Sequence, residues 1–451
     1  MQFPHFFVPR AGGGLLIAAV AIFHIMIAHF AVGTGLFNAV SETVARRRGD
    51  TALREFLRTH TRFLILLSFV AGAVSGVGIW LTTAIVSPSA ISTLIHQFMW
   101  GWATEWVFFI VEIAAGYVYY YGWDRLDPRT HEIVGWIYAA SAWLSLFVIN
   151  GILTFMLTPG AWLSEHDFWL GFFNPTMLPS LLIRTVSCVS LAAIFAVIIA
   201  SVDKKLDRDE RGRIVRYAGL WLMSMVLMLP LSLWYFVMVP AKSRDLVFGG
   251  AVPMTMFFVF GLIASTILGL YAWFGVVRRS HDVNLPTALT MLAVSAIATG
   301  SLEFVREGIR KPFVISGYMY SNSILKTDVP ELNRTGILAK ARWVVPQGAD
   351  PRTATPQDRG RWVFDAECAQ CHTMDGFNAM RPLVKGWSRP LIDMSLSRLD
   401  EMKYFMPPFV GSDAERRDLG VYLDMLDGVE NVPPRPESPP QKEPPQRRRQ
   451  P

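Results

Sequence analysis

The sequence predicts an all-α protein in which a bundle of eight transmembrane helices is followed by a small α-helical domain. Of 451 residues, 52% are apolar and 17% are charged. The apolar residues gather between Leu15 and Leu302, in runs near the length of about 20 residues that a membrane helix needs. The predicted domains are a transmembrane domain (1–312), a connector (313–354), a second domain (355–430) and a Pro-rich tail (431–451). The tail has too few apolar residues to bury a core, so disorder is expected there.

Eight apolar segments are long enough to cross a bilayer. They lie near Leu15–Val40, Phe63–Val86, Ile95–Tyr121, Glu132–Leu157, Leu178–Val202, Ala218–Val239, Val252–Val277 and Thr287–Phe304. Lys and Arg concentrate in the first, third, fifth and seventh connecting loops, while the second and fourth loops contain none. The positive-inside rule therefore places the odd loops in the cytoplasm and both chain termini outside. The net charge of +6 follows this membrane asymmetry and does not indicate a nucleic-acid partner.

The stretch Cys368-Ala-Gln-Cys371-His372 carries the most specific chemistry in the chain. The C-x-x-C-H spacing is typical of c-type haem attachment, in which two thiols form thioethers and the adjacent imidazole binds the iron. The remaining cysteine, Cys188, lies in an apolar segment and is expected to be a small packing residue. A zinc or redox C-x-x-C pair beside a chance histidine is the alternative.

A methionine follows this motif at a suitable distance for the opposite face of a haem. Met406 precedes Pro407 and Pro408, whose stiffness would hold its thioether in place. The segments 395–404 and 414–426 are expected to be helical. The region from Pro356 to Gly428 resembles a class I cytochrome c domain, and Met/His ligation implies electron transfer. Haem c is attached outside the membrane, which agrees with the predicted side of the C-terminus.

Several ionisable residues fall inside the predicted membrane helices, where each costs about 2.5–3.5 kcal/mol at mid-bilayer. His24 lies about 15 Å below the outer surface, at 1.5 Å per residue. This depth suits an axial haem ligand, although a structural histidine is the alternative. Glu105 and Glu112 are seven residues apart on one helical face. They suit a proton path, or two protonated carboxyls that hydrogen-bond between helices.

The predicted eighth helix ends in a dense cluster of charges. Glu303 and Glu307 share one face of the helix. Arg306 lies between them in sequence, and Arg310 and Lys311 follow. The simple interpretation is a helix end whose long side chains reach the interface. Arg184, near the outer end of the fifth helix, could pair with a haem propionate or with a carboxylate such as Glu307. The histidines His60 and His96 are expected at the membrane interface, and no role is predicted for them or for His29.

Five stretches of the membrane region resemble subunit I of cytochrome bd-type oxidases. They are Ala21-Ile-Phe-His24 through Gly33, Glu112, Gly122-Trp-Asp-Arg-Leu126, Asn174-Pro175 and Glu307-x-x-Arg310-Lys-Pro-Phe313. The resemblance runs from about Leu15 to Phe313. It implies that His24 and Glu307 are ligands of two membrane haems of b and/or d type. It also implies that Glu112 is one of two proton-carrying carboxylates; the other position holds Thr104, with Glu105 one residue away. Arg310 falls on the arginine of the family's E-x-G-R-Q-P-W run.

The chain departs from that family in its electron-entry region. Arg184 occupies the place of a histidine that binds the family's low-spin haem, and Phe257 occupies the place of its methionine partner, with Met254 and Met256 nearby. The loop where the family oxidises quinol shrinks to residues 240–251. The cytochrome c-like domain stands where the ninth helix would be. These differences predict loss of the low-spin haem and of the quinol site.

The sequence therefore predicts a haem oxidoreductase of the bacterial inner membrane. Electrons would pass between haem c, held by Cys368, Cys371, His372 and Met406, and the membrane haems, with dioxygen reduced to water. The expected partners are a second membrane subunit of the bd subunit II type and either a periplasmic electron-transfer protein or the quinone pool. The alternatives are a non-enzymatic electron conduit, a quinol:cytochrome c reductase, and a structural subunit with haem c alone.

Overall fold

The computed structural model describes residues 4–426. Contacts divide the chain into two compact units. The membrane unit comprises Gly13–Lys326 together with Tyr404–Pro407, and the terminal unit comprises the described parts of Met1–Gly12, Thr327–Lys403 and Pro408–Pro451. The predicted connector is thus shared between the two units. The tail that was predicted to be disordered lies outside the described residues.

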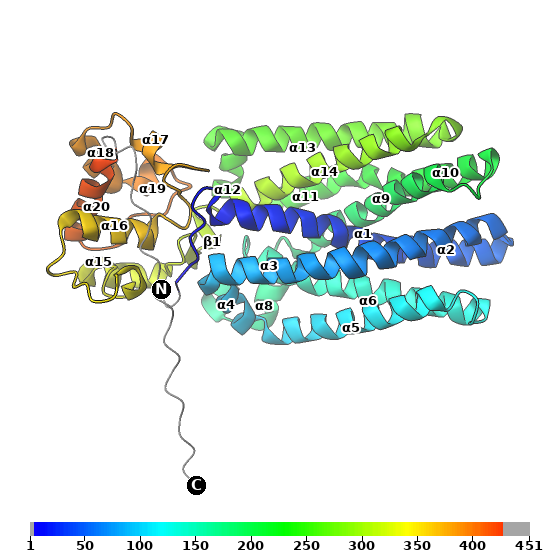
Figure 1. Cartoon of the computed structure of the whole chain (residues 1–451), viewed down its shortest axis with the longest axis horizontal. Coiled ribbons are helices and arrows are strands. Elements are labelled where there is room, and N and C mark those ends of the chain that lie inside the picture. The colour runs from blue at the N-terminus through cyan, green and yellow to red at the C-terminus, as the bar shows by residue number, and fades with distance from the viewer. Residues whose placement is uncertain (1–3, 427–451) are drawn as a thin grey trace, which may run out of the picture. The chain divides into compact units, whose positions relative to one another are not determined.

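The membrane unit is built from long helices that run side by side (Figure 1). Within residues 4–426, seven helices are long and apolar enough to span a membrane, or eight if one bent pair counts as a single span. The first half contains α1 (Gly12–Arg48), α2 (Thr51–Leu66), η1 (Leu67–Gly72), α3 (Ala73–Val86), α4 (Pro88–Gln97), α5 (Met99–Tyr121) and α6 (Pro128–Phe155). The second half contains α7 (Trp162–Glu165), α8 (Phe168–Phe172), α9 (Met177–Val202), α10 (Arg208–Leu222), η2 (Met223–Leu227), α11 (Met228–Met238), α12 (Ala241–Asp245), η3 (Leu246–Gly250), α13 (Val252–Tyr271), η4 (Ala272–Val277), η5 (Ser280–Asp282) and α14 (Leu285–Gly308).

The third predicted span is wrong in one respect, because it is broken near its start. α4 and α5 meet at an angle of 85°. Phe98 at the corner is fully buried, and its ring packs against Phe155 at 4.9 Å and Phe168 at 5.6 Å. The indole of Trp102 donates to the carbonyl of Leu94 across the break. Burial of Phe98 therefore stabilises a bend that an uninterrupted apolar sequence does not reveal.

Side-chain caps mark where several helices begin. Asp50 accepts a hydrogen bond from the backbone of Leu53 at the start of α2, and Asp127 caps α6, in which Pro128 occupies the first turn. Asp207 and Glu210 form a capping box on α10. These side chains satisfy backbone N–H groups that have no partner inside the helix. They fix the ends of the helices and hence the register in which polar side chains face one another.

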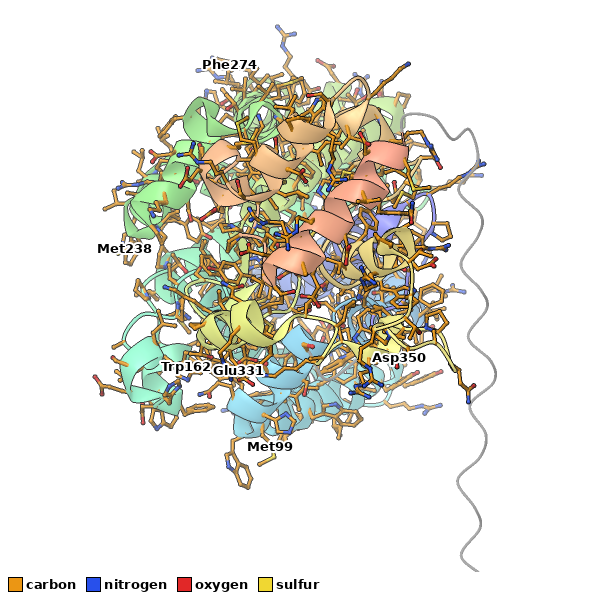
Figure 2. The ribbon with its side chains drawn as sticks, turned by 90° about the vertical axis from the view of Figure 1, so that its left-hand side faces the viewer. Met99, Trp162, Met238, Phe274, Glu331 and Asp350 are labelled. Atoms are coloured by element: carbon orange, nitrogen blue, oxygen red, sulfur yellow. The ribbon has the colours of Figure 1, made fainter. Side chains whose placement is uncertain are left out.

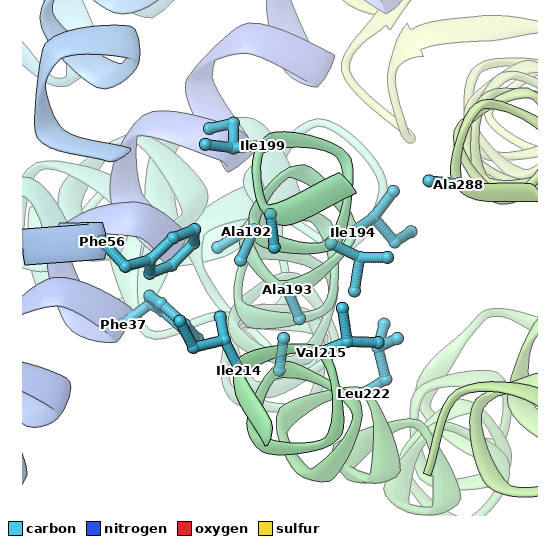
Figure 3. Packing of buried hydrophobic residues seen from close by; sticks show 14 of the residues in the cluster. Phe37, Phe56, Ala192, Ala193, Ile194, Ile199, Ile214, Val215, Leu222 and Ala288 are labelled. Carbon is cyan, nitrogen blue, oxygen red and sulfur yellow. The ribbon is translucent and has the colours of Figure 1, made fainter. Parts of the chain in front are cut away.

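α9 lies at the centre of the main apolar core (Figure 3). Its residues Ala192, Ala193 and Ile194 are fully buried against Phe37 and Val215 among others. α9 also crosses α1 closely, because a Cβ on Gly33 would lie 1.9 Å from the carbonyl oxygen of Cys188. Cys188 is fully buried there, as predicted for a packing residue. Small side chains thus bring the backbones of α1 and α9 together, as is common between membrane helices.

The periphery of the bundle is apolar. Figure 2 shows Met99, Met238 and Phe274 at its rim, and these side chains are 56%, 39% and 55% exposed. Large exposed apolar side chains of this kind match the hydrocarbon of a bilayer rather than water. Together with the spanning helices, they identify an integral membrane protein.

A short hairpin of β1 (Phe313–Ile315) and β2 (Met319–Tyr320) follows α14 in the membrane unit. The next elements are η6 (Lys326–Asp328), α15 (Val329–Thr335), η7 (Arg342–Val344), α16 (Pro356–Glu367), α17 (Met380–Val384), α18 (Arg389–Leu396), α19 (Leu399–Met402) and α20 (Asp413–Met425). The helices expected over 395–404 and 414–426 correspond to α19 and α20, and the first is much shorter than predicted.

α16 and α20 form the framework of the terminal unit. They cross at Gly360, where a Cβ would lie 2.1 Å from the carbonyl oxygen of Asp418. Arg359 reinforces the crossing through Nε, which lies 2.6 Å from Oδ2 of Asp418. The unit also includes the start of the chain, since the backbone N–H of Phe377 donates to the carbonyl of Arg10. The predicted haem-binding motif begins where α16 ends.

Candidate functional site

His24 is fixed by a hydrogen bond between α1 and α3. Its Nδ1 lies 3.0 Å from Oγ of Ser75. The Ser75 hydroxyl donates to the carbonyl of Ala71 at 2.7 Å, so towards His24 it acts as the acceptor. The proton of neutral His24 is therefore on Nδ1, and the lone pair is on Nε2. This is the arrangement that a metal-binding histidine requires.

Arg184 binds residues other than the one that the sequence suggested. Its Nη2 lies 3.4 Å from Oε1 of Glu303, whose second oxygen accepts from Nε of Arg306 at 2.6 Å. Its Nη1 lies 3.4 Å from Nε2 of His29. The expected partner among the carboxylates, Glu307, is therefore replaced by Glu303. His29 directs its Nε2 lone pair at a guanidinium, so this nitrogen is already engaged.

Glu307 pairs with Arg310 one turn away. The Glu307 side chain is 50% exposed, whereas that of Arg310 is 4% exposed. Arg310 also donates through Nη1 to the carbonyl of Val314 at 3.2 Å and contacts the sulfur of Met156 at 2.9 Å. Arg310 thus joins the end of α14 to β1 and to the end of α6. It holds the Glu307 carboxylate at this edge of the bundle.

A small cavity of about 10 Å³ lies beside this charge cluster. Three guanidinium groups line it, from Arg184, Arg306 and Arg310, together with the hydroxyl-bearing side chains of Thr154 and Tyr235. The volume suffices for about one water molecule. The surrounding positive charge favours an anionic group, such as a carboxylate, at this position.

Glu105 and Glu112 both face α6 from α5. Oε1 of Glu105 accepts from the hydroxyl of Ser145 at 2.8 Å. Glu112 hydrogen-bonds with Tyr138, whose hydroxyl also lies 3.3 Å from the carbonyl of Ala31. The two carboxyls therefore occupy one seam between α5 and α6. Each of them has a hydroxyl partner through which a proton can exchange.

The C-x-x-C-H motif forms a tight turn after α16. The N–H groups of Cys371 and His372 both donate to the carbonyl of Cys368, at 3.0 and 2.8 Å. Nδ1 of His372 lies 3.1 Å from the carbonyl of Asn378, and Nδ2 of Asn378 donates to the carbonyl of Cys371 at 2.9 Å. A carbonyl can only accept, so Nδ1 carries the proton and Nε2 the lone pair. These residues fit a c-type haem whose iron is bound by His372.

Glu367 connects the end of α16 to the segment that follows Met406. Its Oε2 accepts from the backbone N–H of Val410 at 3.1 Å. Burial raises the pKa of Glu367 well above its ordinary value, and the Val410 N–H only partly offsets this effect. Burial likewise raises the pKa of the Cys368 thiol. Cys368 is therefore a thiol at neutral pH.

Met406 falls in the stretch Tyr404–Pro407, which groups with the membrane unit. Its pairing with His372 across a haem stays a prediction. His24 and Glu307 each bind their own partners, Ser75 and Arg310. In the described part of the chain, no group of three or more His, Cys, Asp or Glu side chains gathers as a metal site.

His60, which was expected at the membrane interface, packs inside the bundle. It is fully buried, and its Nδ1 lies 2.8 Å from Oδ1 of Asn38. The aromatic rings of Phe30, Phe37 and Phe56 surround it. His96 is exposed and bonds to the carbonyl of Ser92 in its own helix.

Sequence reasoning missed the residues that orient the candidate ligands. Ser75 and Asn378 had no signal of their own, because each acts through one hydrogen bond to a distant or backbone atom. In the structure, Asn378 adopts a positive φ of 50°, which asparagine tolerates better than most residues.

Two comparisons with known proteins found a similarity. Residues 15–239 match the family described as Cytochrome bd terminal oxidase subunit I. The structure of bd oxidase from Geobacillus thermodenitrificans aligns with a TM-score of 0.61 and 16% identity, covering 68% of this chain and 88% of that one. At this identity the likeness shows a shared fold. No curated protein sequence matches the chain.

Proposed function

Because residues 15–239 carry a cytochrome bd oxidase subunit I domain, we propose that this chain is a membrane haem oxidoreductase with its own c-type haem. Electrons would pass between haem c and haems within the membrane unit. The acceptor would be dioxygen, which is reduced to water. The observation that carries the proposal is the presence of a C-x-x-C-H turn, with its histidine oriented for ligation, in the same chain as that domain.

Cys368 and Cys371 would hold haem c through thioethers, and His372 would bind its iron through Nε2. The hydrogen bond from His372 to the carbonyl of Asn378 supports this role, because it fixes the ring orientation and tautomer. Met406 would be the second axial ligand. A bound haem of this type supplies one-electron transfer with little rearrangement.

His24 and Glu307 would be axial ligands of membrane haems of b and/or d type. The Ser75 contact supports His24, since it directs the lone pair of Nε2 away from α3. Arg184 and Arg310 would bind haem carboxylates, which suits their place around a positively lined cavity. The engagement of Arg184 with Glu303 and His29 also supports the absence of a low-spin haem at that position.

Glu105 and Glu112 would carry protons towards the oxygen-reducing centre. Reduction of dioxygen to water consumes protons, and buried carboxyls with hydroxyl partners can transfer them. The hydrogen bonds to Ser145 and Tyr138 on α6 support the role. The proposed setting is a bacterial inner membrane with both termini in the periplasm. The proposed partners are a bd subunit II-type protein and a periplasmic electron-transfer protein or the quinone pool.

A haem inventory tests this proposal. The purified protein should contain haem c together with haem b or d by pyridine haemochrome analysis. Its reduced form should show a carbon monoxide difference spectrum from a high-spin membrane haem. A protein with haem c as its sole haem would contradict the proposal and support the structural-subunit alternative.

The second candidate is a non-enzymatic electron conduit. The pairing of Glu307 with Arg310 favours it, because the guanidinium competes with an iron for the carboxylate. The carbon monoxide spectrum separates the two candidates. Binding of carbon monoxide supports the enzyme, and membrane haems that are all low-spin support the conduit.

A further inference from the structure

Three buried polar residues form a cluster that the proposed function does not use. Glu42 on α1, Tyr119 on α5 and His131 on α6 are 3%, 1% and 0% exposed. An isolated ionised carboxylate or imidazole is costly at such sites, so buried groups of this kind are normally paired. Their grouping on three helices is therefore a built feature of the membrane unit.

The hydrogen bonds of the cluster determine how many protons it holds. Nδ1 of His131 lies 2.6 Å from Oε1 of Glu42, and Nε2 of His131 lies 2.8 Å from the carbonyl of Tyr119. The Tyr119 hydroxyl donates to Oε2 of Glu42 at 2.7 Å. The carbonyl can only accept, so Nε2 carries a proton. One further proton must lie between Nδ1 and Oε1, and it belongs to the pair rather than to either residue.

Charged groups from the neighbouring helices surround the cluster. Arg46 on α1 acts electrostatically on Glu42, and Arg54 on α2 acts on Tyr119. Glu132, next to His131 in sequence, binds Arg46 and the hydroxyl of Thr43 instead. This end of the bundle carries the Arg-rich loops that sequence charge places in the cytoplasm. The cluster thus lies a short distance inside the predicted cytoplasmic surface.

A second buried network continues from the cluster towards the bundle interior. Tyr119 lies next to Thr61, which accepts from Nδ2 of Asn38 at 3.1 Å. Oδ1 of Asn38 lies 2.8 Å from Nδ1 of His60. Because Nδ1 donates there, Nε2 of His60 carries the lone pair. In the described chain this nitrogen is buried and has no hydrogen-bond partner. It is an available proton acceptor.

The cluster stands in register with the two proton-carrying carboxyls. Along the α5–α6 seam, Glu105 faces Ser145, Glu112 faces Tyr138, and Tyr119 stacks on His131 with ring centroids 4.4 Å apart. Successive pairs are separated by seven residues on both helices, which is about 10 Å along the helix axis.

Two glycines lie in the interval between the Glu112–Tyr138 pair and the Tyr119–His131 pair. Tyr138 packs on Gly116, and Tyr119 packs on Gly135. Because neither glycine has a side chain, the tyrosine rings lie directly against the helix backbones. Phe69 also touches Gly116 and would have to move for water to enter this interval.

We propose that Glu42, Tyr119 and His131 form a proton-donating site that refills Glu112 from the Arg-rich end of the bundle. The inference rests on the proposed function, which makes Glu112 a consumer of protons. When Glu112 has given up its proton, the proton shared by His131 and Glu42 passes to its carboxylate over one or more water molecules in the interval. The pair is left one proton short, and a proton from solvent restores it.

The test follows protons and electrons separately in the purified, fully reduced protein after mixing with dioxygen. A pH-indicating dye reports proton uptake, and haem absorbance reports oxidation. Glu42→Gln should slow proton uptake by roughly 100-fold, which is the usual contribution of a positioned proton-transfer group to the rate. The haem content and the carbon monoxide spectrum should be unchanged. Glu132→Gln, at the neighbouring position with a different partner, is the matched control and should behave as the unaltered protein.

Tyr119→Phe provides a second variant if Glu42→Gln does not assemble. It keeps the ring stacked on His131 and removes the hydroxyl that binds Glu42, so slower proton uptake is again expected. Unchanged uptake in an assembled variant, with normal haem oxidation, would overturn the proposal.

An infrared pH titration of the resting protein tests the pair without any haem reaction. A band of the shared proton that is present in the unaltered protein and lost in Glu42→Gln supports the pair, and a spectrum identical in both proteins counts against it. If no membrane haem oxidises at all, the proposed function fails, and the infrared result still decides whether the pair binds a proton.

Discussion

At the scale of single residues, the candidate histidine ligands are distinguished by the hydrogen-bond partner of the ring nitrogen that would not bind iron. His24 and His372 each have Nδ1 engaged by an acceptor, Ser75 in one case and Asn378 in the other. Nε2 therefore carries the lone pair in both. His29 differs, because its Nε2 faces Arg184. Hydrogen-bond geometry thus separates histidines that composition alone could not rank.

Ser75 should tune the membrane haem that His24 is proposed to bind. Ser75→Ala removes the acceptor for Nδ1, and the ring then loses its fixed orientation. We expect the affinity for that membrane haem to fall by about 10-fold, in line with other partners of metal-binding histidines. Haem content per protein, titrated after partial extraction, measures the change.

Ser75→Thr is the matched control, since it keeps the hydroxyl, and it should retain the haem. Equal haem retention by the Ala and Thr variants would show that the Ser75 contact has no part in ligation.

Asn378 should affect the proposed haem c through its backbone. Its φ of 50° is tolerated by asparagine and glycine but not by a β-branched residue. Asn378→Val should displace the carbonyl that holds His372 and shift the reduction potential of haem c. Potentiometric titration at the haem c absorbance band measures this shift.

Asn378→Gly keeps the backbone conformation and should leave the potential much closer to that of the unaltered protein. A Val variant with an unchanged potential would contradict the role assigned to this carbonyl.

At the scale of elements, the helices were more predictable than their interruptions. The eight apolar segments all appear as helices, because length and apolarity suffice to identify them. The bend at Phe98 and the π-helical turn Leu67–Gly72 that precedes the Ser75 segment were not predictable. The bend depends on tertiary contacts, namely the rings of Phe155 and Phe168 around Phe98. An apolar sequence carries no local signal for such breaks.

The crossing of α16 and α20 depends on the missing side chain at Gly360. Gly360→Ala would place a Cβ 2.1 Å from a backbone oxygen, which cannot move as a flexible side chain can. We expect the terminal unit to lose about 1–3 kcal/mol of stability, as overpacked sites do. Chemical unfolding of the full-length protein, followed at haem c, measures the loss.

Gln357→Ala, at an exposed position of the same helix, is the control and should change stability little. If the Gly360 variant unfolded together with this control, the close helix crossing would not be a determinant of stability.

Glu367 should make the terminal unit less stable as pH rises. Its folded pKa is raised by burial, so ionisation costs more in the folded state than in the unfolded chain. The penalty is absent below the unfolded pKa of about 4.3 and grows as pH rises towards the folded value, by about 1.4 kcal/mol per unit of pKa shift. Glu367→Gln should therefore be more stable than the unaltered protein at pH 8 and equal to it at pH 4.

Glu401→Gln, which changes an exposed carboxylate, serves as the control. Unfolding curves measured across pH should show a pH-dependent difference in stability between Glu367→Gln and the unaltered protein. Glu401→Gln should show no such difference. A difference that is the same at pH 4 and pH 8 would exclude ionisation of Glu367 as its cause.

At the scale of the whole molecule, contacts group the described residues into two units. Residues 4–12 were assigned to the membrane region, yet Arg10 bonds to Phe377 in the terminal unit. The connector was expected to be a single linker, but Glu415 accepts from the backbone N–H groups of Ile337 and Leu338 and ties that part to α20. Such long-range backbone contacts leave no pattern in the local sequence. The chemistry-bearing residues, by contrast, stood out because charges and histidines are rare in apolar helices.

The central claim is that one chain passes electrons between its haem c and a membrane haem that reacts with dioxygen. Rapid mixing of the fully reduced protein with dioxygen, followed at the haem c band, tests it most directly in the unaltered protein and in His24→Ala. The account predicts prompt oxidation of haem c in the unaltered protein, and slow oxidation in His24→Ala despite an intact haem c spectrum. Equal rates in the two proteins would contradict it.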